Sequence, residues 1–103
     1  MEQPDAIIHQ PVRLKIMAAL KILPGNEALE FVRLKSIVGA TEGNLGAHIT
    51  TLEEAGYVEV EKDFVGKKPR TRVRLSIKGR RAFEEYVAYL REIINSGNAD
   101  SLS

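Results

Sequence analysis

The second half of the chain contains two segments in which apolar and polar residues alternate. The segment 71–77 (Thr-Arg-Val-Arg-Leu-Ser-Ile) alternates strictly, and the segment 57–65 is rich in β-forming residues. A period of two is typical of strands that bury one face. The connection at 66–70 contains a glycine and a proline, which favour a turn. We therefore predict a β-hairpin over residues 57–77, against which the rest of the chain must pack.

Apolar residues at helical spacing predict four helices around this hairpin. The first begins at Pro11, because proline suits the first turn of a helix, and stops at Pro24. A second, brief helix ends at Gly39. Thr41 is a good N-cap for a third helix, and a long helix follows the hairpin over about residues 78–95.

The predicted order is helix, short strand, helix, helix, β-hairpin and C-terminal helix. The short strand lies at 28–31, which is too short for an independent element. Two helices joined by the turn at 39–41 form a helix-turn-helix, and a hairpin directly after them makes a winged helix. The fold class is thus α+β and mainly helical. A chain of 103 residues fits one domain, expected at 1–96, with 97–103 as a disordered tail.

Basic residues are concentrated in one stretch. Residues 62–81 contain nine Lys or Arg and one acid, a formal +8, whereas the rest of the chain carries −7 and the total is +1. Clustered positive charge indicates a polyanionic partner, although a solvated basic strand face is the plainer alternative. In this basic wing, 62–74, the residues expected on the backbone or in the minor groove of DNA are Lys67, Lys68, Arg70 and Arg72.

The predicted third helix, 42–55, has small uncharged residues opposite its apolar side. At 100° per residue, Leu45, Ile49 and Leu52 cluster together, and the opposite face is narrow enough for the major groove. An ordinary amphipathic helix would show the same pattern. His48 lies on the flank, where a partly buried, hydrogen-bonded histidine is favoured over a base reader, and contact with a phosphate is the third alternative. The residues assigned to DNA contact are Thr41, Gly43, Asn44, Ala47, His48, Thr50 and Thr51.

Two glycines, Gly43 and Gly46, lie in the first half of this helix. Each costs about 1 kcal/mol of helix stability relative to alanine. Close approach of another backbone, or an irregular first turn, would explain them.

The last helix has a wider apolar surface than one domain face needs. About half of it should pack on the domain, and the surplus favours self-association. Two copies would present two recognition helices to half-sites about 34–36 Å apart. The residues assigned to the dimer interface are Ile7, Ile8, Phe83, Tyr86, Tyr89, Leu90 and Ile93.

Several function classes are excluded or disfavoured. The chain has no cysteine, which excludes disulfides and thiolate zinc sites. Its two histidines, His9 and His48, lie in different elements, so no metal site is expected. Known nucleophile, phosphate-loop and metalloprotease motifs are absent, so we expect neither an enzyme nor a cofactor. No apolar run approaches the ~20 residues of a membrane span, and the start lacks a signal peptide, so a cytoplasmic protein without membrane contact is expected.

Six strings together resemble winged-helix transcriptional regulators of the MarR/ArsR-like superfamily, in particular its small single-domain members. The resemblance covers about residues 9–90. The strings are Pro11-Val-Arg-Leu-Lys-Ile-Met17, Phe31-Val-Arg-Leu-Lys35, Asn44-Leu-Gly-Ala-His-Ile49, Leu52-Glu-Glu-Ala-Gly-Tyr-Val58, Phe64-Val-Gly-Lys-Lys-Pro-Arg-Thr71 and Leu75-Ser-Ile-Lys-Gly-Arg80.

This resemblance implies a dimeric DNA-binding regulator that dimerises through terminal helices and uses the helix 42–55 for recognition. Gly46 stands where many relatives have serine, so one polar contact is missing. ArsR-type metal sensing relies on Cys or His clusters, which this chain lacks. MarR-type proteins often bind a small-molecule effector at the dimer junction, but nothing in the sequence identifies one.

The sequence therefore predicts sequence-specific binding of double-stranded DNA by a homodimeric transcriptional regulator. A non-enzymatic winged-helix module for protein interaction is the alternative, favoured by the wide apolar last helix. RNA binding is a third possibility. It is disfavoured because proteins that read RNA by stacking usually expose aromatic residues, and the basic loop has none.

Overall fold

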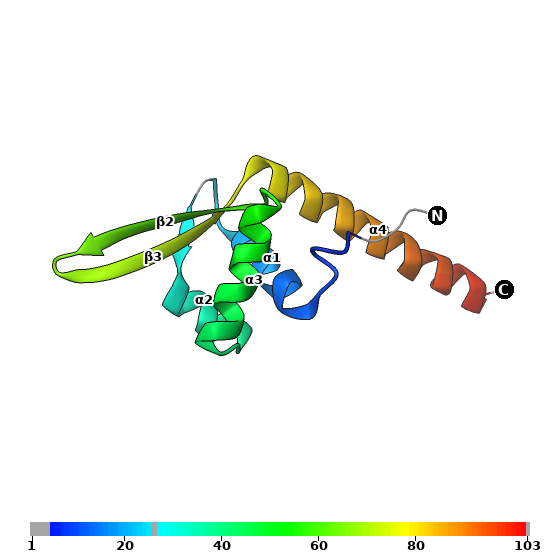
Figure 1. The fold of residues 1–103 in the computed structure, drawn as a ribbon. Coiled ribbons are helices and arrows are strands. Elements are labelled where there is room, and N and C mark those ends of the chain that lie inside the picture. The colour runs from blue at the N-terminus through cyan, green and yellow to red at the C-terminus, as the bar shows by residue number, and fades with distance from the viewer. Residues whose placement is uncertain (1–4, 26, 103) are drawn as a thin grey trace.

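The computed structural model describes residues 5–25 and 27–102, with side chains described as far as Ser96. Its elements follow the predicted winged-helix order, so the predicted fold class is confirmed. They are α1 (Pro11–Ile22), β1 (Ala28–Glu30), α2 (Phe31–Val38), α3 (Glu42–Glu54), β2 (Val58–Val65), β3 (Lys68–Leu75) and α4 (Ile77–Leu102). The β2–β3 hairpin and α4 leave the helical body on opposite sides (Figure 1).

The sheet is antiparallel, with strand order β1-β3-β2. Glu30, the last residue of β1, lies opposite Arg72, so within the described part of the chain no third strand pairs with the outer half of the hairpin. The turn is shorter than the predicted loop, since β3 begins at Lys68 directly after Gly66-Lys67. Gly66 has φ +65°, a conformation that glycine adopts without strain. The hairpin, hereafter the wing, therefore projects from the body as a two-stranded arm.

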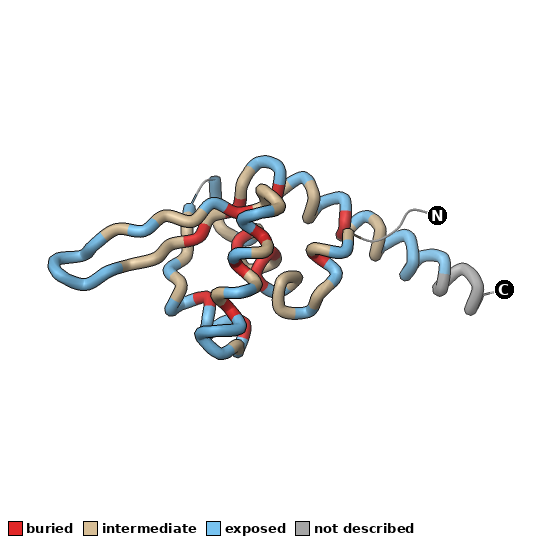
Figure 2. The backbone as a smooth tube through the Cα atoms, viewed as in Figure 1, coloured by how far each residue is buried: buried red, intermediate tan, exposed pale blue. Residues whose placement is uncertain are grey.

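The core lies where α1, α2 and α3 meet the base of the sheet, and burial falls off towards the wing tip and along α4 (Figure 2). Each helix contributes a stripe and the strands contribute one face, as the periodicities predict. The buried apolar residues are Ile8, Ile16, Met17, Leu20, Leu34, Val38, Leu45, Ile49, Leu52, Val58, Val73, Leu75 and Tyr86.

The turn between α2 and α3 is formed as the sequence indicates. Gly39 ends α2 with a left-handed conformation, φ 68°. Thr41 is the N-cap of α3, and its hydroxyl accepts a hydrogen bond of 3.2 Å from the backbone N–H of Asn44. This capping fixes where α3 begins and hence which of its residues face outward.

α4 is longer than expected. The prediction of a helix over about 78–95 and a disordered tail at 97–103 differs from the structure, in which the backbone stays helical to Leu102. Residues 95–102 include weak helix formers but no proline, so nothing in the sequence forces the helix to stop. Across the described part of the chain, no helix combines the length and apolar character that a bilayer span requires.

Candidate nucleic-acid interface

The outer face of α3 is exposed and carries no charge near its centre. Leu45, Ile49 and Leu52 are buried, as predicted. Thr50 and Thr51 donate their hydroxyls to backbone carbonyls one turn earlier, at 3.0 and 3.2 Å, and their oxygens can still accept. The residues on the exposed side are Thr41, Gly43, Asn44, Ala47 and Thr50, with Thr51 partly buried.

The glycines of α3 border open space. A Cβ built at Gly43 or at Gly46 would meet no heavy atom within 4 Å among the described residues. Neither glycine is therefore explained by a close approach within the chain. Gly46 lines a groove of about 550 Å³ between α3 and the wing, together with Thr50, Lys62 and other residues of both elements.

His48 points to the flank of α3 towards α1. Its Nδ1 lies 3.1 Å from Nη1 of Arg13, whose Nε donates to the backbone carbonyl of Ile7 at 2.5 Å. Burial, and secondly the positive charge of Arg13, lower the pKa of His48 below 6.5. The geometry favours the partly buried, hydrogen-bonded alternative for this residue over base contact.

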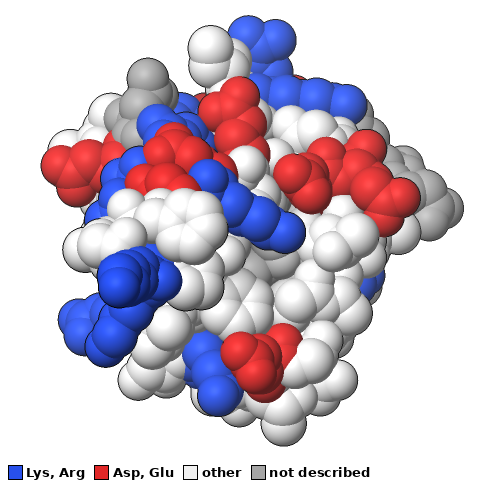
Figure 3. Space-filling view, turned by 60° about the vertical axis from the view of Figure 1, so that its left-hand side comes forward, with Lys and Arg blue, Asp and Glu red and all other residues white. Residues whose placement is uncertain are grey.

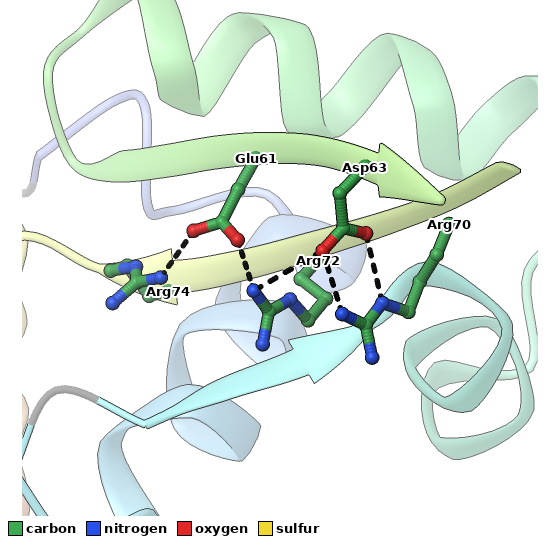
Figure 4. A network of polar contacts seen from close by, with 5 residues as sticks. All are labelled: Glu61, Asp63, Arg70, Arg72 and Arg74. Atoms are coloured by element: carbon green, nitrogen blue, oxygen red, sulfur yellow. Dashed lines mark hydrogen bonds and ion pairs between the residues drawn. The ribbon is translucent and has the colours of Figure 1, made fainter. Parts of the chain in front are cut away.

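The wing carries a network of acids and arginines on the sheet face opposite the core (Figure 4). Asp63 accepts two hydrogen bonds from Arg70, at 2.9 and 2.6 Å, and lies 3.5 Å from Arg72. Glu61 pairs with Arg72 and, at 2.7 Å, with Arg74. The hydrogen bond from Arg70 lowers the pKa of Asp63, and the same pair raises the pKa of Arg70.

Arg70 and Arg72, which the sequence assigns to DNA contact, both belong to this network, and contact of either residue with DNA stays a prediction. Both are held by carboxylates of the neighbouring strand, on the side of the sheet away from α3. The basic window began at Lys62 and so left out two acids of β2. The complete hairpin 58–75 contains six bases and three acids, a formal +3.

Two further basic residues of the window make contacts within the fold. Nζ of Lys78 lies 5.7 Å from the centre of the Tyr57 ring, and Nη2 of Arg80 donates to the carbonyl of Gly25 at 3.1 Å. The remaining basic side chains are exposed and form no ion pair with another described residue. They are Lys62, Lys67, Lys68 and Arg81.

Lys67 and Lys68 lie at the wing tip, as predicted, and Lys62 lies on the side that faces α3. Figure 3 shows blue side chains at the projecting wing, apart from the mixed red and blue patch of the network. Lys62 was not among the assigned DNA contacts. Its register opposite Thr71, on the face of Val60 and Val73, would have indicated its position.

An exposed aromatic residue also escaped the sequence reasoning. Phe64 lies opposite Pro69 near the wing tip and is 70% exposed, with Val65 beside it 55% exposed. The loop at 66–70 contains no aromatic residue, as stated, but Phe64 lies on the strand directly before it. Phe64 follows the alternation of the core face but lies beyond the point where the helices cover that face.

The residues assigned to the dimer interface fall into a buried group and a group with exposed surface. Ile8 is fully buried and Tyr86 is 5% exposed, so both belong to the core of the single chain and are corrections to the assignment. The hydroxyl of Tyr86 lies 2.6 Å from Nδ1 of His9, which ties the N-terminal segment to α4. The others keep some exposed surface: Ile7, Phe83, Tyr89, Leu90 and Ile93.

α4 also borders a surface hollow of about 360 Å³. Phe83 and Val87 supply part of its lining, and Lys21 of α1 closes one side. Among the described residues, no group of three or more His, Asp or Glu side chains is arranged to hold a metal ion.

A helix-turn-helix with a capped, exposed second helix and a basic two-stranded wing defines a winged-helix nucleic-acid-binding domain. The family model described as winged helix DNA-binding domain matches residues 12–94, and the chain belongs to this family.

Similar proteins agree with this family. An uncharacterized protein of Methanocaldococcus jannaschii is 40% identical over 81 residues, which are 79% of this chain and 85% of that protein. The solved structure of a transcriptional regulator homologue from Pyrococcus horikoshii OT3 is 31% identical, covers 87% of this chain and 86% of its own, and superposes with a TM-score of 0.77. NadR in complex with 4-hydroxyphenylacetate shares the fold at 21% identity and a TM-score of 0.67, over 94% of this chain and 68% of NadR.

Proposed function

We propose that this protein is a homodimeric transcriptional regulator that binds specific double-stranded DNA sequences. α3 enters the major groove, and the wing lies along the backbone or in the minor groove. The observation that carries the proposal is the uncharged, exposed face of α3 beside a wing whose tip presents Lys67 and Lys68.

The residues of α3 and the wing have different tasks in this arrangement. Asn44 is exposed next to the helix N-terminus and can pair bidentately with adenine, while Thr51 can meet base edges. Lys62, Lys67 and Lys68 supply phosphate contacts, which add affinity without reading sequence. Gly43 and Ala47 keep the helix surface low, so that the backbone of α3 comes close to the bases.

Selection of bound duplexes from a random library, followed by binding measurements with variants, tests this division. Asn44→Ala should change the ranking of sequences. Lys67→Ala with Lys68→Ala should weaken binding to all duplexes and leave the ranking unchanged. Lys15→Ala with Lys35→Ala, exposed cations of α1 and α2, is the control with the same change in charge. An unchanged ranking after Asn44→Ala removes that residue from the reading set, and absence of duplex binding by the wild type refutes the proposal.

Salt dependence gives a second test. Three lysines per protomer that neutralise phosphates give about six contacts per dimer, so log K should fall with log salt at a slope of about −5. Binding that salt does not weaken would contradict DNA contact by the wing. Equal affinity for structured RNA would favour RNA instead.

The dimer is proposed to form through α4. The first half of this helix packs on the core through Ala82, Phe83 and Tyr86, but Ile93 and Ile94 farther along are 42% and 59% exposed. The helix projects beyond the body, where a second copy could pack along it (Figure 1). Burying its apolar residues against a partner would stabilise such a dimer.

Sedimentation equilibrium of Ile93→Asp tests the dimer. A shift towards monomer is expected, because a charge would replace an apolar contact. Val32→Asp is the control, since Val32 is 74% exposed on α2 and away from α4. A monomeric wild type would refute dimerisation. A dimer that binds no duplex would instead favour the interaction-module alternative, for which the exposed isoleucines of α4 are the surface.

A small-molecule effector stays a prediction from the resemblance.

A further inference from the structure

The acids of the wing occupy all three of its arginines. Register places Glu61 opposite Arg72 and Asp63 opposite Arg70, and Arg74 reaches Glu61 diagonally. Arg72 lies between both carboxylates (Figure 4). The five side chains form a continuous ladder along one face of the hairpin.

The ladder changes how the wing meets a polyanion. The hairpin has six bases, and the two acids of the ladder, together with Glu59 outside it, reduce its formal charge to +3. An arginine already paired with a carboxylate must leave its partner before it neutralises a phosphate and displaces the cations condensed there. It therefore contributes less to the release of counterions that drives non-specific DNA binding.

The ladder adds little to the stability of the folded chain. Side chains of the pairs are 27–43% exposed, and ion pairs with this degree of exposure contribute little to the free energy of unfolding. The acids instead neutralise arginines that, if they were unpaired, would attract any duplex, whatever its sequence.

We propose that Glu61 and Asp63 are specificity determinants that restrain non-specific DNA binding by pairing with the arginines of the wing. This inference rests on the proposed function. The two acids leave the lysines at the tip to contact phosphate. The difference in affinity between one duplex and another then depends on the bases that α3 contacts.

The test compares the wild type with Glu61→Gln plus Asp63→Asn, each as the full chain, on a selected duplex and on an unrelated duplex over a range of salt concentrations. The variant should bind the unrelated duplex on the order of tenfold more tightly at low salt. Its salt slope should steepen by about 0.9 for each arginine that gains a phosphate. The ratio of specific to non-specific affinity should fall.

A control with the same change in charge is Glu84→Gln plus Glu92→Gln on α4, both exposed and remote from the wing. If the wing variant behaves like this control, the inference is wrong. If it loses affinity only for the selected duplex, the acids position the arginines for specific contact, which also overturns the inference. If the wild type binds no duplex, the proposed function itself fails, and the inference fails with it.

A second arm asks whether the arginines carry the gain. Arg70→Gln should change non-specific affinity little in the wild type but several-fold in the double variant, where Arg70 has lost its carboxylate. Equal effects in both backgrounds would overturn the inference. If the double variant does not fold, as judged by circular dichroism, Asp63→Asn alone serves, because Glu61 then still pairs with Arg72 and Arg74. In the Asp63→Asn background, Arg70→Gln should again change non-specific affinity several-fold, because only Arg70 has lost its hydrogen-bonded carboxylate.

Discussion

Gly79, in the first turn of α4, lies directly against the backbone that leads into the wing. A Cβ at this position would be 2.0 Å from the carbonyl oxygen of Tyr57 and 2.9 Å from its Cα. The Tyr57 carbonyl accepts a hydrogen bond from the backbone N–H of Ser76 at 3.0 Å, and the Tyr57 N–H donates to Leu52 at 2.9 Å. Any side chain at position 79 must therefore move a backbone segment that is held at both ends.

The magnitude of Gly79→Ala follows from opposing effects. Alanine is a better helix former than glycine by about 1 kcal/mol. Overpacking costs about 1–3 kcal/mol, and weakening the hydrogen bond to Tyr57 costs about 1 kcal/mol more. We expect net destabilisation of about 1–3 kcal/mol, which lowers Tm by roughly 4–8 °C per kcal/mol in a domain of this size.

Thermal unfolding followed by circular dichroism, at one fixed protein concentration, measures the effect. Gly46→Ala is the matched control, since it also lies in a helix but a Cβ there meets nothing within 4 Å among the described residues. Its propensity gain should raise the free energy of unfolding by up to about 1 kcal/mol. If Gly79→Ala is as stable as Gly46→Ala, the close packing of α4 on the Tyr57 backbone is not as described.

Three further changes test individual contacts. Burial lowers the pKa of His48 in the folded protein below its ordinary value of 6.5. The stability gained by keeping His48 neutral is therefore present above pH 6.5 and is lost as pH falls from 6.5 through the lowered pKa of the folded state. His48→Gln should therefore flatten the acid-side fall of Tm, and an unchanged fall would contradict this reasoning. Tyr86→Phe removes the hydrogen bond to His9 and should cost about 1 kcal/mol in chemical denaturation, whereas no loss would mean that the bond is not maintained in solution. The pKa of Tyr57 is raised to about 12, by burial and then by its hydrogen bond to Asp5, so Asp5→Asn should lower it in a spectrophotometric titration; an unaltered titration would show that the bond is absent.

The fold was largely predictable from local patterns. Thr41 and Gly39 mark the ends of their helices through backbone geometry that depends on adjacent residues only. The buried stripe of α3 follows from helical spacing, and the alternation in 71–77 follows from the pleat of a strand. The length of α4 was missed because no local signal ends it.

The candidate site was predictable only in part. The exposed face of α3 and the lysines of the wing tip lie where the sequence indicates. The pairing of Arg70 was missed because its partner is Asp63, seven residues earlier on the paired strand. Tyr86 was misassigned because the N-terminal segment covers it, through a contact between residues 77 positions apart.

The sequence by itself determined the order of elements, the caps, the apolar faces and the presence of excess positive charge, since each depends on residue type and short-range spacing. Only the tertiary structure decided which charges remain available to DNA and which apolar residues remain available to a partner. The physical reason is that strand register and helix docking bring distant residues together. The register of β2 on β3 pairs the arginines with acids, and the docking of α4 buries Tyr86 while leaving Ile93 exposed.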